Sequence, residues 1–83
     1  MTEYNIYIVE DEEHLASVLK AYLEKEGWIV RVIHDGEEAL KQIENPPHLW
    51  VLDIMLPGVD GYEILRKIRE NSDTPVIERA RSE

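Results

Sequence analysis

Acidic side chains directly follow the two strongest apolar runs of this chain. Glu10 and Asp11 come after the apolar run 6–9, and Asp53 comes after the run 49–52. Strands buried on both faces of a parallel sheet are continuously apolar, and open α/β folds place their sites at the carboxyl ends of such strands. We therefore expect the three carboxylates to lie side by side at one edge of a sheet.

Three neighbouring carboxylates point to metal and phosphate chemistry. Two unit charges 4 Å apart repel by ~4 kcal/mol at an effective dielectric constant of about 20. A hard divalent cation such as Mg²⁺ relieves this repulsion, because it prefers oxygen ligands and typically binds one or two carboxylates beside a phosphate. An ionised aspartate beside such a metal is also a nucleophile, which can attack phosphorus in line without a general base.

The elements that position these side chains follow from the apolar spacing. The apolar runs predict strands at residues 5–9, 28–33, 49–52 and from residue 74 onward. Helical stripes lie between them, and Asp35 and Asp60 have the spacing of N-terminal caps. The stripe of the first helix consists of Leu15, Val18, Leu19, Tyr22 and Leu23. This alternation predicts an α/β fold with a mostly parallel sheet and helices on both faces.

Composition limits the function classes. The 83 residues suffice for one domain, and a net charge of −9 disfavours nucleic-acid binding by this segment. Cysteine is absent, which excludes disulfides and thiolate metal sites. Because the start has no basic region followed by an apolar one, and no apolar stretch approaches bilayer length, we expect a cytoplasmic chain that does not bind membranes.

One joint pattern resembles the receiver domain of bacterial two-component response regulators. It consists of Glu10 and Asp11, the strand-terminal Asp53, Met55, and the sequence Leu-Pro-Gly-Val-Asp-Gly-Tyr at 56–62. The resemblance spans about residues 4–77. The sequence Leu-Asp-Ile-Met-Leu-Pro-Gly at 52–58 further resembles the corresponding motif of the subfamily in which the receiver precedes a winged-helix DNA-binding domain.

The resemblance implies a role for each site residue. Asp53 would accept phosphate from the phosphohistidine of a sensor histidine kinase. Asp11 and Asp53 would bind Mg²⁺ directly, Glu10 would bind it through water, and the backbone carbonyl of Met55 would complete the protein ligands. The chain would then be a phosphorelay signalling module, not an enzyme, and its full-length parent would regulate transcription.

The chain also departs from the family pattern. Receivers have five βα units in the strand order 2-1-3-4-5, so we expect residues 1–83 to form a truncated receiver without an output domain: a partial flavodoxin-like fold with the strand order 2-1-3-4 and three helices. Polar Glu78 and Arg79 replace apolar residues that would continue the fourth strand. If Ala80 and Arg81 are aligned with the family's Ala-Arg, Arg79 stands where the family has a Ser or Thr hydroxyl, and Ser82 lies beyond the motif. The lysine of the family's fifth strand has no counterpart.

A shortened receiver suggests a second hypothesis. Apolar surface left bare at the sheet edge and face would favour a homo-oligomer that pairs or swaps around the fourth strand. The chain would then be a truncated or engineered fragment that acts as a self-associating structural module without phosphotransfer. A third hypothesis, an aspartyl-nucleophile phosphohydrolase, is rejected, because that class needs a second Asp two residues after the nucleophile and Met55 stands there.

Overall fold

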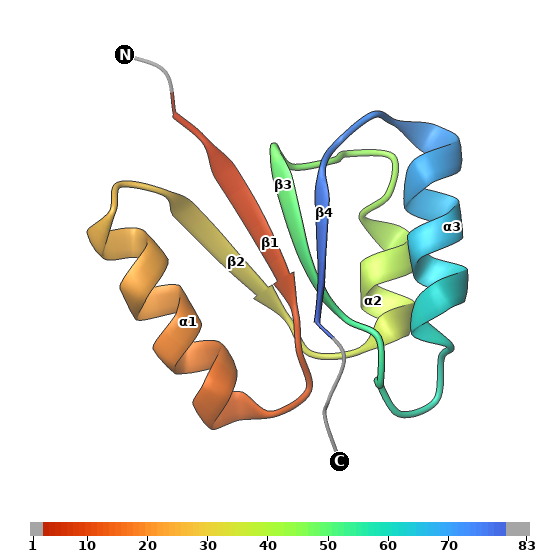
Figure 1. The fold of residues 1–83 in the computed structure, drawn as a ribbon, viewed down its shortest axis with the longest axis horizontal. Helices are drawn as coiled ribbons and strands as arrows, with labels where there is room; N and C mark the ends of the chain where they lie inside the picture. The colour runs from red at the N-terminus through yellow and green to blue at the C-terminus, as the bar shows by residue number, and fades with distance from the viewer. Residues whose placement is uncertain (1–2, 80–83) are drawn as a thin grey trace.

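Strands and helices alternate along the whole of the described chain. The computed structural model describes residues 3–79 (Figure 1). The elements are β1 (Asn5–Val9), α1 (Glu13–Lys25), β2 (Ile29–Ile33), α2 (Gly36–Lys41), β3 (Leu49–Asp53), α3 (Gly61–Asn71) and β4 (Val76–Arg79). Ala80, Arg81 and Ser82, which were used above for the family alignment, lie outside the described residues.

The strands form one parallel sheet in the order β2-β1-β3-β4. This confirms the predicted fold class and strand order. Two strands begin later than the apolar pattern predicts. The N–H of Trp28 still bonds to the carbonyl of Leu23 at the end of α1, so β2 begins at Ile29. Pro75 has no N–H for the ladder, and β4 begins immediately after it.

The fourth strand continues through the polar residues that appeared to end it. Asp53 and Arg79 are register partners, and the N–H of Ile54 bonds to the carbonyl of Arg79 at 3.1 Å. Ladder bonds use backbone atoms, so polar side chains at an edge strand do not prevent pairing. The expectation that Glu78 and Arg79 interrupt this strand was therefore wrong.

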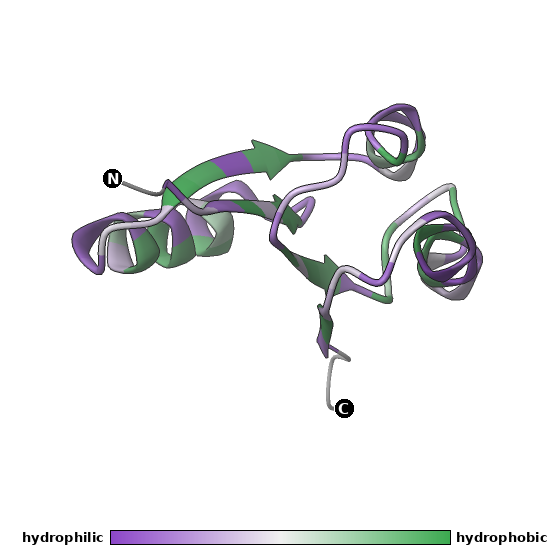
Figure 2. Ribbon diagram, turned by 90° about the horizontal axis from the view of Figure 1, so that it is seen from above, coloured by the Kyte–Doolittle hydropathy of each residue, from purple (hydrophilic) through white to green (hydrophobic). Residues whose placement is uncertain are grey.

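Helices cover both faces of the sheet, as predicted (Figure 2). The α1 face has a small core around Ile6, Ile8 and Val30, against which Leu19 and Leu23 pack. The opposite face carries the larger core under α2 and α3. Its buried members are Val9, Ile33, Ala39, Ile43, Trp50, Leu52, Ile54, Leu56, Ile64, Leu65 and Ile68.

The stripe predicted for α1 is only partly correct. Leu15, Leu19 and Leu23 are partly buried, whereas Val18 and Tyr22 are exposed. Ala16 is the fully buried residue of this helix, so the inward face is rotated toward it. None of the helices within residues 3–79 combines the length and the apolar character needed to cross a bilayer.

Candidate metal and phosphoacceptor site

Three carboxylates converge at the carboxyl edge of the sheet. Glu10, Asp11 and Asp53 each offer an oxygen atom, and these atoms lie within 4.8 Å of one another. Glu10 and Asp53 are only 1% exposed, and Asp11 is partly exposed. The proximity expected from the two apolar runs is therefore present.

Strand alternation explains why Glu10 and Asp53 meet. Ile6 and Ile8 of β1 point to the α1 face, so the same period of two directs Glu10 to that face. On β3, Val51 points to the α1 face and Asp53 follows it at the same period. The register pairs Val9 with Leu52, so Glu10 and Asp53 come next on their two neighbouring strands.

Backbone N–H groups orient both buried carboxylates. The N–H of Glu12 donates to Oε2 of Glu10 at 3.1 Å, and the N–H of Met55 donates to Oδ1 of Asp53 at 2.9 Å. Both donors lie two residues after the carboxylate that they contact. The chain thus turns sharply after β1 and β3, and each turn holds the side chain that ends its strand.

The segment between β3 and α3 is shaped by Gly58, Asp60 and Gly61. Gly58 has φ +85°, a conformation that glycine adopts without steric cost. Asp60 caps α3 by accepting a hydrogen bond from the N–H of Tyr62 at 2.9 Å, as its spacing predicted. Gly61 packs so closely on the backbone of Ile54 that a Cβ there would overlap it.

Arg79 joins the carboxylate cluster from the edge strand β4. Its Nη2 atom forms ion pairs with Oε1 of Glu10 and, at 3.3 Å, with Oδ2 of Asp53. The alignment of Ala80 and Arg81 considered above would place Arg79 where the family has a hydroxyl, but these contacts were not predicted. The available signal was the alternation of β4: Val76 packs on the core under α2 and α3, so Arg79, three residues later, points to the α1 face.

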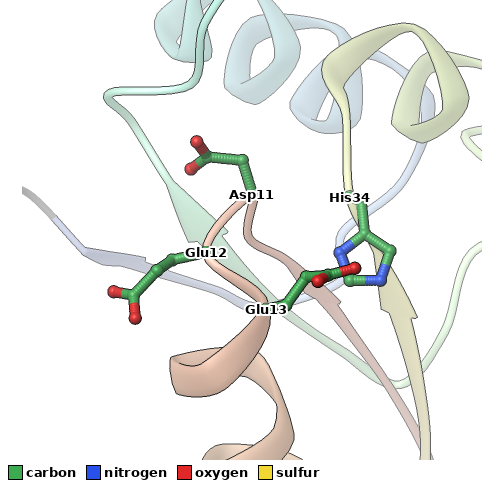
Figure 3. A pocket seen from close by; sticks show the side chains of 4 residues that line it. All are labelled: Asp11, Glu12, Glu13 and His34. Atoms are coloured by element: carbon green, nitrogen blue, oxygen red, sulfur yellow. The ribbon is translucent and has the colours of Figure 1, made fainter.

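An open pocket lies beside the cluster, at the start of α1. Its volume is about 490 Å³, and it is lined by Asp11, Glu12, Glu13 and His34 (Figure 3). His34 follows β2, whereas the three acidic residues follow one another after β1. The carboxylate of Glu12 points away from that of Glu13 in Figure 3. Asp11 thus connects the carboxylate cluster to an accessible acidic rim.

The family model described as "Response regulator receiver domain" matches residues 6–79. This chain belongs to that family. Transcriptional regulatory protein CssR of Bacillus subtilis is 49% identical over 75 residues, which cover 89% of this chain and 33% of CssR. Transcriptional regulatory protein CpxR of Klebsiella pneumoniae is 42% identical over 72 residues, which cover 87% of this chain and 31% of CpxR. The chain therefore spans about a third of the curated relatives it matches.

Solved receivers have the same fold. A putative response regulator from Chloroflexus aurantiacus aligns with a TM-score of 0.85 at 33% identity, over 93% of this chain and 66% of the other. The receiver domain of sensor histidine kinase PA1611 from Pseudomonas aeruginosa aligns with a TM-score of 0.84 at 30% identity, over the same shares of the two chains. That structure is described as having a magnesium ion coordinated in its active site cleft.

The donor set of this receiver fits a magnesium ion. Glu10, Asp11 and Asp53 present only oxygen atoms, two of the carboxylates are buried and held by backbone N–H groups, and the third faces solvent. Mg²⁺ favours such hard oxygen donors and retains several waters, which the accessible side of Asp11 accommodates. A bound cation would share Glu10 and Asp53 with Arg79.

Proposed function

We propose that this receiver accepts a phosphoryl group on Asp53 from the phosphohistidine of a sensor histidine kinase. The observation that carries the proposal is the convergence of Glu10, Asp11 and Asp53 within 4.8 Å at the ends of β1 and β3. Family membership and the names of the relatives support a signalling module of a transcriptional regulator. A cytoplasmic location is part of the same proposal.

We also propose that the site binds Mg²⁺. Asp11 and Asp53 would be its direct ligands, Glu10 would bind through water, and the backbone carbonyl of Met55 would complete the protein ligands. When bound, Mg²⁺ neutralises part of the charge on the phosphoryl oxygens and on the carboxylates. The oxygen-only donor set supports this assignment.

Asp53 performs the covalent step in this proposal. A carboxylate oxygen forms a bond to phosphorus as the phosphorus–nitrogen bond of the phosphohistidine breaks, and the electron pair of that bond stays on the imidazole nitrogen. The product is an acyl phosphate on Asp53. No general base is needed, because an ionised carboxylate is already nucleophilic. The hydrogen bond from Met55 fixes one oxygen of Asp53 and thereby sets the direction of the other.

A small-molecule phosphodonor tests this function without the cognate kinase. The purified chain is incubated with phosphoramidate and Mg²⁺, and its intact mass is measured. We expect one added phosphoryl group in the unmodified chain and none in Asp53→Asn. Asp60→Asn is a matched control, because Asn also caps helices and Asp60 lies on the exposed side of the same loop. Equal labelling of the Asp53 variant, or no labelling of the unmodified chain, would refute the proposal.

A self-associating module without phosphotransfer is the second candidate function. One observation favours it: Ile77, on the edge strand β4, is 55% exposed. Exposed apolar edge strands pair readily with other chains. Sedimentation of the chain together with the labelling experiment separates the two candidates, since a stable oligomer that takes up no phosphate would select the second.

A further inference from the structure

Arg79 crosses from the outer strand of the sheet to the innermost carboxylate of the cluster. In the strand order β1-β3-β4, Asp53 lies between Arg79 and Glu10, and one nitrogen of the guanidinium contacts both carboxylates. The side chain of Arg79 is 34% exposed, whereas both carboxylates are 1% exposed. The guanidinium therefore covers the buried pair on the side of β4.

The position of Arg79 is set by the fold and not by a flexible loop. Its backbone pairs with Asp53 in register, and its carbonyl accepts a ladder bond from Ile54. Its neighbour Glu78 points to the opposite face, where it bonds to Arg69 of α3. Strand alternation thus directs the side chain of Arg79 to the face of the sheet on which both carboxylates lie.

The guanidinium of Arg79 partly neutralises the two buried carboxylates, as a bound metal ion would. Two buried carboxylates need positive charge nearby, and removing a buried charge partner is strongly destabilising. Arg79 supplies one positive charge at the oxygens Oε1 of Glu10 and Oδ2 of Asp53. A divalent cation that uses the same carboxylates meets both the repulsion of that charge and the cost of displacing its hydrogen bonds.

We infer that the positively charged guanidinium of Arg79 competes with the divalent metal for Glu10 and Asp53. This inference rests on the Mg²⁺ site proposed above. Arg79 then stabilises the metal-free fold and lowers the affinity for Mg²⁺. The site consequently changes from an ion-paired state to a metal-bound state only at raised Mg²⁺ concentration.

Calorimetric titration with Mg²⁺ tests the competition. The three proteins compared are the unmodified chain, Arg79→Met and Arg69→Met. Arg69→Met is the matched control, because it removes the same charge from an exposed ion pair, 64% exposed at the Arg69 side chain, on the other face of the sheet. We expect Arg79→Met to bind Mg²⁺ about tenfold more tightly than Arg69→Met, since a nearby positive charge and its hydrogen bonds are gone.

Thermal unfolding gives a second measurement. In EDTA, Arg79→Met should unfold at a lower temperature than Arg69→Met, and saturating Mg²⁺ should restore most of the loss. If Arg79→Met does not fold, Arg79→Gln replaces it, because glutamine removes the charge but keeps a side-chain amide that can donate to the carboxylates. Its Mg²⁺ affinity should then lie above that of the unmodified chain.

The possible failures are distinguishable. Mg²⁺ affinities of Arg79→Met and Arg69→Met that agree within about twofold, or weaker binding by Arg79→Met, would overturn the competition but leave the metal site in place. No Mg²⁺ binding by any of the three proteins would overturn the metal site itself, and the competition with it.

Discussion

Gly61→Ala should destabilise this receiver although alanine is the better helix former. Gly61 is the first residue of α3, where propensity alone would favour alanine by up to ~1 kcal/mol. A Cβ at this position would lie 2.5 Å from Cα of Ile54 and 2.7 Å from its carbonyl carbon. Carbon atoms normally approach to about 3.5–4.0 Å, so the backbone after Asp53 would have to move.

The cost of this overlap exceeds the gain in propensity. Overpacking typically costs about 1–3 kcal/mol, and the upper end applies because backbone must shift here. The net loss is then about 2 kcal/mol, equivalent to roughly 8–16 °C in Tm for a domain of this size. Urea unfolding followed by tryptophan fluorescence measures this loss, since Trp50 is fully buried and Trp28 is partly buried.

The neighbouring substitution Tyr62→Ala is the control, because the side chain of Tyr62 is exposed on the same helix turn. It should change stability by less than about 0.5 kcal/mol. A Gly61→Ala protein that is as stable as the unmodified chain, or more stable, would refute the packing of α3 on the segment after Asp53.

Three further outcomes are expected from the surface of the receiver. Asp60→Ala removes the N-terminal cap of α3 and should cost ~1 kcal/mol in urea unfolding, while Asp60→Asn should cost much less. The hydrogen bond from Arg66, together with its charge, lowers the pKa of Glu63, and the resulting stabilisation is present at neutral pH and lost as pH falls through the lowered pKa. In an NMR titration, the Glu63 carboxyl should therefore protonate at higher pH after Arg66→Met. An unchanged titration midpoint would contradict the pairing of Glu63 with Arg66. Ile77→Lys places a charge on the edge strand and should lower the sedimentation coefficient if β4 mediates self-association. An oligomer that is unaffected would locate the contact elsewhere.

The sequence was sufficient to predict the sheet and the carboxylate cluster. The apolar runs before Glu10 and Asp53 indicate strands covered on both faces, and parallel strands bring their carboxyl ends to one edge. Those two facts predict the proximity of Glu10, Asp11 and Asp53 without any knowledge of the loops. The family pattern, in turn, was carried by the same residues and by the turn that follows β3.

The contacts of Arg79 could not be predicted from apolar pattern alone. Val76 and Ile77 are followed by two polar residues, so the apolar run that indicates β4 ends at Ile77, two residues before the strand does. Backbone pairing with β3 continues regardless, and it places Arg79 opposite Asp53. The exposed positions of Val18 and Tyr22 have a comparable origin, because the spacing of a stripe indicates a helix but not how far that helix is rotated on the sheet.

Beryllofluoride binding tests the central claim most directly, because this phosphoryl analogue binds a carboxylate only in a site shaped for phosphate. The measurement is a ¹⁹F NMR spectrum of the chain with beryllofluoride, with and without Mg²⁺. We expect protein-bound fluorine signals that require Mg²⁺ and that are absent in Asp53→Asn. Signals of equal intensity in Asp53→Asn, or none in the unmodified chain at saturating Mg²⁺, would contradict a phosphate-accepting Asp53.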